Sequence, residues 1–244
     1  MKIAGKQLVM RPRLIVEVVR KLDLKALWLP DRQRILIDSD QPRLKWRWNE
    51  AHEIIHSVIE WHKDYLHGDT ERTLKPLCHA QIEAEANYGA GRLLFLQQLF
   101  DEFVMNSQPS FDLVMAANKK FGNTMTSTLW RVTEALGVPA LAIVSQHPHY
   151  RTPDFDRLNP CKYFIRSQSF EERFASISEI EAFEILRGYC SWRKRGPVAK
   201  EEVIIADDRG DAHVFLFEAF CHKYEMLSLI SYLRPHPNTI ISLS

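Results

Sequence analysis

The residues best suited to chemistry are two histidines and a glutamate in the run His52-Glu53-Ile54-Ile55-His56. Residues four apart share one face of a helix, so the imidazoles of His52 and His56 can bind one Zn²⁺ ion. Glu53 would then lie beside the open coordination position, where a carboxylate can accept a proton from the attacking water. The pattern predicts metal-assisted hydrolysis, with His52 and His56 as metal ligands and Glu53 as the catalytic base.

A catalytic zinc site needs a third protein ligand and keeps its fourth position for water. A second helical run, from residue 81 to about residue 100, supplies candidates; its apolar stripe comprises Ile82, Ala86, Gly89, Leu93, Leu96 and Phe100. Glu85 lies on the flank of this stripe, beside small residues that would let two helices approach closely. A carboxylate there is costly unless a partner such as a metal compensates it. We therefore prefer Glu85 as the third ligand; the alternatives, in declining order, are Glu83, His79 and Cys78.

The elements before and around the two histidines must position them. Residues 44 to 48 alternate apolar and basic side chains, which predicts a half-buried strand. Asn49 would cap a helix that starts near Glu50 and ends at Gly68. The apolar side of that helix would carry Ala51, Ile55, Val58, Ile59 and His62.

Further upstream, short strands are predicted at residues 26 to 29 and 34 to 38, after a helix at residues 11 to 24. The sequence therefore predicts a small antiparallel sheet that leads into the metal-binding helix, which is the usual zincin arrangement.

Two motifs occur in order, Ala-His-Glu-x-x-His at residues 51 to 56 and Glu-x-Glu-Ala-Asn at residues 83 to 87. Together they resemble the ImmA/IrrE family of zinc metallo-endopeptidases, over roughly residues 10 to 140. The resemblance implies a zincin-like core in which His52, His56 and Glu85, the Glu directly before Ala-Asn, bind Zn²⁺ and Glu53 is the base. One departure is Ile55, which stands where the family usually has Gly or Ala.

The resemblance also implies a function. The chain would be a cytoplasmic zinc-dependent endopeptidase of a stress response, and its substrate would be a regulatory protein such as a helix-turn-helix repressor. The alternative is a non-catalytic or DNA-associated transcriptional regulator with a structural metal site. A structural site does not need Glu53, so the intact motif favours the enzyme.

Composition agrees with a soluble cytoplasmic protein. The 244 residues, 45% hydrophobic, suffice for two compact domains or for one domain with a large appendage. A net charge of +1 gives no general attraction to nucleic acid or to anionic membranes. The four cysteines are widely spaced, which indicates reduced thiols in a cytosol rather than a zinc ribbon. Apolar runs are too short to span a membrane.

The predicted fold class is α+β, in three regions: a zincin-like metallopeptidase core at residues 1–108, a helix-turn-helix-like segment at 109–146 and a mixed α/β region at 147–244. In the second region, helices are predicted at residues 111 to 120 and from Thr124 or Thr126 to 136. A recognition helix needs basic groups, and Arg131 is the one cation between residues 126 and 136. DNA binding is therefore not favoured over packing against the core.

The third region mixes predicted strands at residues 161 to 166, 202 to 206 and 212 to 220 with a helix from residue 170 to about 194. Residues 207 to 211 would form the turn of a hairpin. This order of strands and helix is similar to that of a sensor-like, GAF-like domain. The comparison is an analogy that rests on the order of elements alone.

Overall fold

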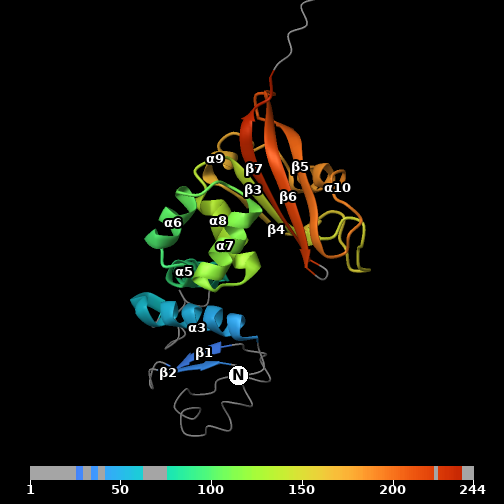
Figure 1. The fold of residues 1–244 in the computed structure, drawn as a ribbon. Helices are drawn as coiled ribbons and strands as arrows, with labels where there is room; N and C mark the ends of the chain where they lie inside the picture. Colours follow the sequence, from blue (N-terminus) through green and yellow to red (C-terminus); the bar gives the residue numbers. More distant parts are fainter. Residues whose placement is uncertain (1–25, 30–33, 38–41, 63–75, 223–224, 238–244) are drawn as a thin grey trace, which may run out of the picture. The chain divides into compact units, whose positions relative to one another are not determined.

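The computed structural model describes residues 26–29, 34–37, 42–62, 76–222 and 225–237 (Figure 1). The chain is a mixed α+β protein that divides into two compact units, Met1–Gln97 and Gln98–Ser244. This division differs from the three predicted regions, because the helices of the predicted middle region belong to the same unit as the strands that follow them. The predicted helix at residues 11 to 24 and the predicted helix end at Gly68 lie outside the described residues.

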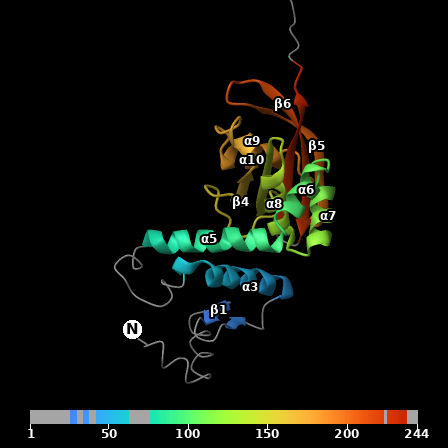
Figure 2. The ribbon, with the colours of Figure 1, turned by 90° about the vertical axis from the view of Figure 1, so that its left-hand side faces the viewer.

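The described residues of the first unit form two short strands and two helices. Strand β1 (Ala26–Leu29) pairs antiparallel with strand β2 (Arg34–Ile37). Helix α3 (Arg43–Val58) packs against both strands and against helix α5 (Pro76–Leu94), so α3 lies between the strands and α5 (Figure 2). Two antiparallel strands of the small sheet and the two facing helices were predicted, and the structure confirms them.

The predicted strand at residues 44 to 48 is wrong, because α3 already begins at Arg43. The amides of Lys45 and Trp46 donate to the carbonyl of Pro42 and close the first turn, so Pro42 and not Asn49 precedes the helix. The physical reason is the spacing of Leu44, Trp48, Ala51 and Ile55. Their steps of four and three residues extend the apolar stripe of the helix upstream, and this helical period prevails over the local alternation.

Helices α3 and α5 approach each other closely at Gly89. A Cβ atom built there would lie 2.8 Å from three carbons of the Ile55 side chain. One residue pair thus explains two features of the sequence: the small residue on α5 makes room, and the isoleucine fills the space. The predicted close approach of the two helices is confirmed at this position.

We expect Gly89→Ala to lower the free energy of unfolding by about 1–2 kcal/mol. Overpacking against a β-branched side chain typically costs about 1–3 kcal/mol, and the better helix propensity of Ala offsets up to about 1 kcal/mol of it. Denaturant unfolding checks this result in the wild type and in an Ile55→Ala background, where the same change should be neutral or stabilising. Gly137→Ala is a matched control, since a Cβ there meets nothing within 4 Å. An equal cost in both backgrounds would contradict the close approach.

Helix α5 stops earlier than predicted. It ends at Leu94, and Leu96 and Gln97 follow with positive φ angles of 54° and 42°. Such angles are unfavourable for side-chain-bearing residues and cannot continue a right-handed helix. Phe100 therefore lies on a separate helix, α6 (Gln98–Met105), which opens the second unit.

The second unit is built on a five-stranded antiparallel sheet with the order β4-β3-β7-β6-β5 (Figure 1). Its strands are β3 (Ala140–Gln146), β4 (Cys161–Arg166), β5 (Gly196–Ala206), β6 (Ala212–His222) and β7 (Glu225–Pro235). The three strands predicted for this region are confirmed. So is the turn after β5, where the Asp207 carboxylate accepts from the amides of Arg209 and Asp211.

Helices cover both faces of this sheet, with α7 and α8 on one side and α9 and α10 on the other (Figures 1 and 2). Their bounds are α7 (Phe111–Phe121), α8 (Met125–Ala135), α9 (Gln168–Glu171) and α10 (Glu179–Arg187). The predicted single helix from residue 170 to 194 is wrong. Ser178 begins α10 separately through a reciprocal capping box with Glu181.

The helix pair α7 and α8 was predicted as a helix-turn-helix-like segment, and both helices are present. Ser110 and Thr124 cap them, and Gly122 ends α7 in the left-handed conformation. Helix α8 packs against β3, β4 and β7, and its Leu129 and Val132 side chains are fully buried. The apolar face of α8 is thus buried within the second unit. Over the described residues, no helix is both long and apolar enough to cross a membrane.

Candidate metal centre

Helix α3 brings the two predicted histidine ligands together. The Nε2 atoms of His52 and His56 lie 3.0 Å apart. Two imidazole nitrogens that bind one tetrahedral zinc ion at about 2.0–2.1 Å are separated by about 3.3 Å. The observed pair is therefore already close to the separation that zinc requires.

The carboxylate that completes this group belongs to Glu83 of α5. Its Oε2 atom lies 3.2 Å from Nε2 of His52, and its Oε1 atom lies 3.8 Å from Nε2 of His56. The donor atoms of the three residues all lie within 4.8 Å of one another, a group that could hold a metal ion. Two imidazoles and one carboxylate form a donor set that suits zinc.

The structure differs from the sequence prediction at this third position. Glu83 was the first alternative, and the preferred residue, Glu85, lies on the opposite flank of α5. Glu83 shares its flank with Asn87, whose Oδ1 atom is 3.1 Å from Nδ1 of His52. Glu85 shares the other flank with Gln81, which donates to Glu85 Oε1 over 3.0 Å. Both flanks border the same apolar stripe, so the rotation of α5 about its axis decides which carboxylate faces the histidines.

Glu85 instead reaches His56 through His62, a role that sequence reasoning missed. Nδ1 of His62 lies 3.1 Å from Nδ1 of His56, and Nε2 of His62 lies 3.2 Å from Oε2 of Glu85. One assignment of protons satisfies both contacts: His56 donates from Nδ1 to His62, and His62 donates from Nε2 to Glu85. The signal in the sequence was a histidine on the apolar face of a helix, since a fully buried imidazole needs polar partners.

The same assignment leaves the Nε2 lone pair of His56 free for a metal. His52 can have the same tautomer. Its Nδ1 can donate to the Asn87 side chain, which leaves Nε2 unprotonated. Metal-binding histidines typically donate their second ring N–H in this way. Burial, together with the neighbouring His52, lowers the pKa of His56 to about 4, so His56 is neutral near pH 7. Neutral imidazole is the form that binds metal.

Glu53, the predicted base, is held by the first strand of the unit. Its Oε2 atom accepts the backbone N–H of Trp28 in β1 over 2.9 Å. Burial raises the pKa of the Glu53 carboxyl, although His52 and the Trp28 amide each oppose this shift. A carboxylate with a raised pKa is a stronger base, which is the property that proton abstraction near neutral pH requires.

An apolar hollow of about 470 Å³ lies between α3 and α5. Glu85 borders it, and its other walls include Ile55, Val58, Ile59, Ala84 and Tyr88. Val58 and Tyr88 are 62% and 60% exposed, although both are largely apolar. The first unit thus places an open apolar surface beside Glu85, the carboxylate that contacts His62.

Comparisons with known proteins show a distant likeness. No protein-family model matches the chain, and no curated protein matches it either. Among solved structures, the chain is similar to a Mycobacterium tuberculosis transcriptional regulator, at 12% sequence identity and a TM-score of 0.48. That match covers 95% of this chain and 72% of the regulator.

Proposed function

We propose that the chain is a zinc-dependent endopeptidase of the ImmA/IrrE type with a zincin-like core. In this proposal His52, His56 and Glu83 hold Zn²⁺, and Glu53 is the general base. The observation that carries the proposal is the convergence of these three donor side chains within 4.8 Å, from two helices that face each other. The geometry favours Glu83 over Glu85 as the third ligand.

Zinc, when bound, supplies Lewis-acid chemistry that acidifies water and polarises a carbonyl. The side chains of this protein would transfer the proton, orient the base and bind the substrate. Glu53 accepts a proton from the water that attacks the peptide carbonyl and returns it to the amine nitrogen as the C–N bond breaks. The Trp28 amide holds one oxygen of Glu53, which fixes the direction of the carboxylate. The apolar hollow beside Glu85 offers room for an apolar side chain of the peptide.

Asn87 and the His62–Glu85 pair have a supporting role. Each accepts the second ring N–H of a ligand histidine, so each fixes one tautomer and one ring orientation. Glu85 thereby contributes to metal binding through His62 without touching the metal.

The proposed substrate is a regulatory protein in the cytoplasm, and a helix-turn-helix repressor is the first candidate. The family resemblance of residues 51 to 56 and 83 to 87 supports this choice. The competing function is a DNA-associated regulator with a structural metal site. Against it, α8 packs its apolar face on the sheet, and its Arg131 pairs with Glu134.

A comparison of metal-loaded and metal-free protein tests the proposed function. The wild type is stripped with a chelator, reloaded with one equivalent of Zn²⁺ and incubated with purified helix-turn-helix repressors encoded near its gene. Casein serves as an unfolded general substrate. We expect defined repressor fragments in mass spectra with zinc and none without it. A protein that holds one zinc per chain and cuts neither substrate would favour the structural-site alternative.

We expect His62→Ala to weaken zinc binding by about ten- to a hundredfold, because loss of an outer-shell partner typically has this effect. His62→Gln should retain part of the affinity, since a Gln oxygen can accept from His56 Nδ1. Competition with a chromophoric chelator measures the affinity, and circular dichroism checks the fold. His222→Ala, at an exposed histidine, is the matched control. Unchanged affinity in His62→Ala would contradict the supporting role.

A further inference from the structure

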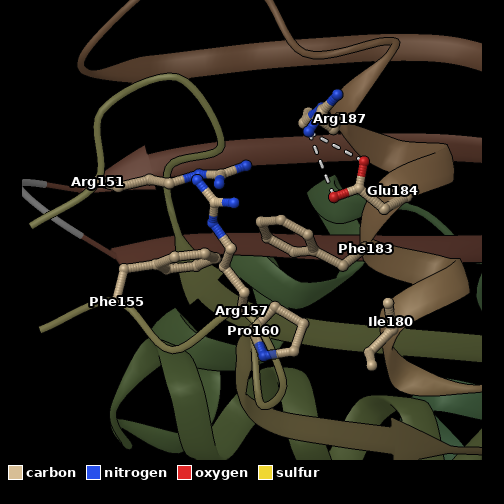
Figure 3. A pocket seen from close by; sticks show the side chains of 8 residues that line it. All are labelled: Arg151, Phe155, Arg157, Pro160, Ile180, Phe183, Glu184 and Arg187. Carbon is tan, nitrogen blue, oxygen red and sulfur yellow. Dashed lines mark hydrogen bonds and ion pairs between the residues drawn. The ribbon is translucent and has the colours of Figure 1, made fainter.

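The second unit contains a pocket of about 200 Å³ that is lined by basic and aromatic side chains (Figure 3). Helix α10 forms one wall with residues at steps of three and four, which is one face of a helix. The segment between β3 and β4 forms the other wall. Figure 3 shows the residues of both walls: Ile180, Phe183, Glu184 and Arg187 from α10, and Arg151, Phe155, Arg157 and Pro160 from the segment.

Three arginines and one glutamate set the charge of this pocket. Arg187 pairs with Glu184 at 3.0 Å, so these two charges compensate each other. Arg151 donates its Nε–H to the carbonyl of Pro148, and its guanidinium lies 4.5 Å from the centre of the Phe155 ring. These contacts hold the Arg151 side chain in place and leave its terminal amino groups for a ligand.

Arg157 has no acceptor among the described residues, although two aspartates lie close to it in sequence. Asp154 accepts from the Thr152 hydroxyl, and Asp156 accepts from the Leu158 amide and the Asn159 side chain. Both carboxylates are therefore engaged locally, and neither lines the pocket.

Two positive charges thus remain uncompensated in a small pocket. Figure 3 shows the Arg151 and Arg157 guanidiniums turned toward the same space beside the two phenylalanine rings. Like charges that face one space repel each other, so an anion bound between them would relieve an unfavourable interaction.

We propose that this pocket binds a small phosphorylated molecule. Its phosphoryl group would lie between Arg151 and Arg157, and its apolar part would rest on Phe183, Pro160 and Ile180. A phosphate monoester carries about −1.5 to −2 charges near pH 7, which matches the two uncompensated arginines. Guanidinium forks bind phosphate oxygens in a bidentate manner. The volume is below the roughly 300–1,000 Å³ of pockets for drug-sized ligands, which limits the ligand to a small molecule.

Titrations of the full-length protein followed by amide NMR test this inference. The probes are inorganic phosphate, phenyl phosphate and benzoate. We expect saturable shifts confined to residues 148–160 and 179–188, with phenyl phosphate binding more tightly than either of the other two. Arg157→Ala should weaken phenyl phosphate by about tenfold, as expected for the loss of a charge-assisted contact. Arg157→Lys should also weaken it, because Lys lacks the planar fork.

Arg195→Ala is the matched control, since Arg195 is exposed and does not line the pocket. This variant loses the same charge and should bind phenyl phosphate as the wild type does. Three results would overturn the inference: shifts that do not saturate, equal losses in Arg157→Ala and Arg195→Ala, or benzoate binding as tightly as phenyl phosphate. Because Arg157 is exposed and unpaired, its removal should leave the fold intact, and the NMR spectra verify this directly.

Discussion

Glu53→Gln is expected to lower the rate of peptide cleavage by about a hundred- to ten-thousandfold while the protein keeps its fold and its zinc. Gln has the shape of Glu and can still accept the Trp28 amide, but it cannot take a proton from water. Removal of a general base typically has an effect of this size. Cleavage of a purified helix-turn-helix repressor under single-turnover conditions measures the rate, and metal analysis of the same sample measures the zinc.

Glu50→Gln is the control for this change, since Glu50 lies on the exposed side of the same helix. It removes one negative charge from α3 without touching the proposed site, so it should cleave at the wild-type rate. Equal cleavage by Glu53→Gln and the wild type would mean that the activity comes from another site or from a contaminant.

The second large effect is expected for the metal ligands. His56→Ala and Glu83→Gln should each weaken zinc binding by more than about a hundredfold, because outer-shell partners alone account for about ten- to a hundredfold. Glu85→Gln should weaken it far less, since Gln can still accept from His62. Chelator competition at pH 7 measures all three variants.

The comparison of Glu83→Gln with Glu85→Gln decides between the two glutamates of the second motif. The geometry assigns the metal to Glu83, whereas sequence resemblance assigns it to Glu85. If Glu85→Gln loses the zinc and Glu83→Gln keeps it, the ligand set inferred from the distances of Glu83 is wrong.

Most of the candidate metal site could be predicted from the sequence because it depends on local geometry. His52 and His56 meet because they are four residues apart on a helix. The close approach of the helices follows from the small size of Gly89. The identity of the facing carboxylate depends instead on how α5 rotates against α3. That rotation is set by tertiary packing, for example by Ile55 against Gly89, and motif spacing carries no information about it.

The fold elements that were predicted wrongly or missed also depend on packing beyond the local sequence pattern. Residues 44 to 48 alternate like a strand, yet they also extend the apolar stripe of α3, and the longer pattern prevails. Strand β3 was not predicted because nearly all of its residues are buried, so it lacks the alternation that marks a half-exposed strand. Its partner β7 was missed for the same reason over its first seven residues.

X-ray absorption at the zinc edge of the zinc-loaded wild type measures the proposed coordination of the metal. We expect a four-coordinate site with two imidazole nitrogens and two oxygens, one from Glu83 and one from solvent, all at about 2.0–2.2 Å. A sulfur neighbour at about 2.3 Å would contradict the proposed ligand set. A shell closed by four protein ligands with no solvent oxygen would contradict the proposed hydrolysis, because it leaves no position for the attacking water.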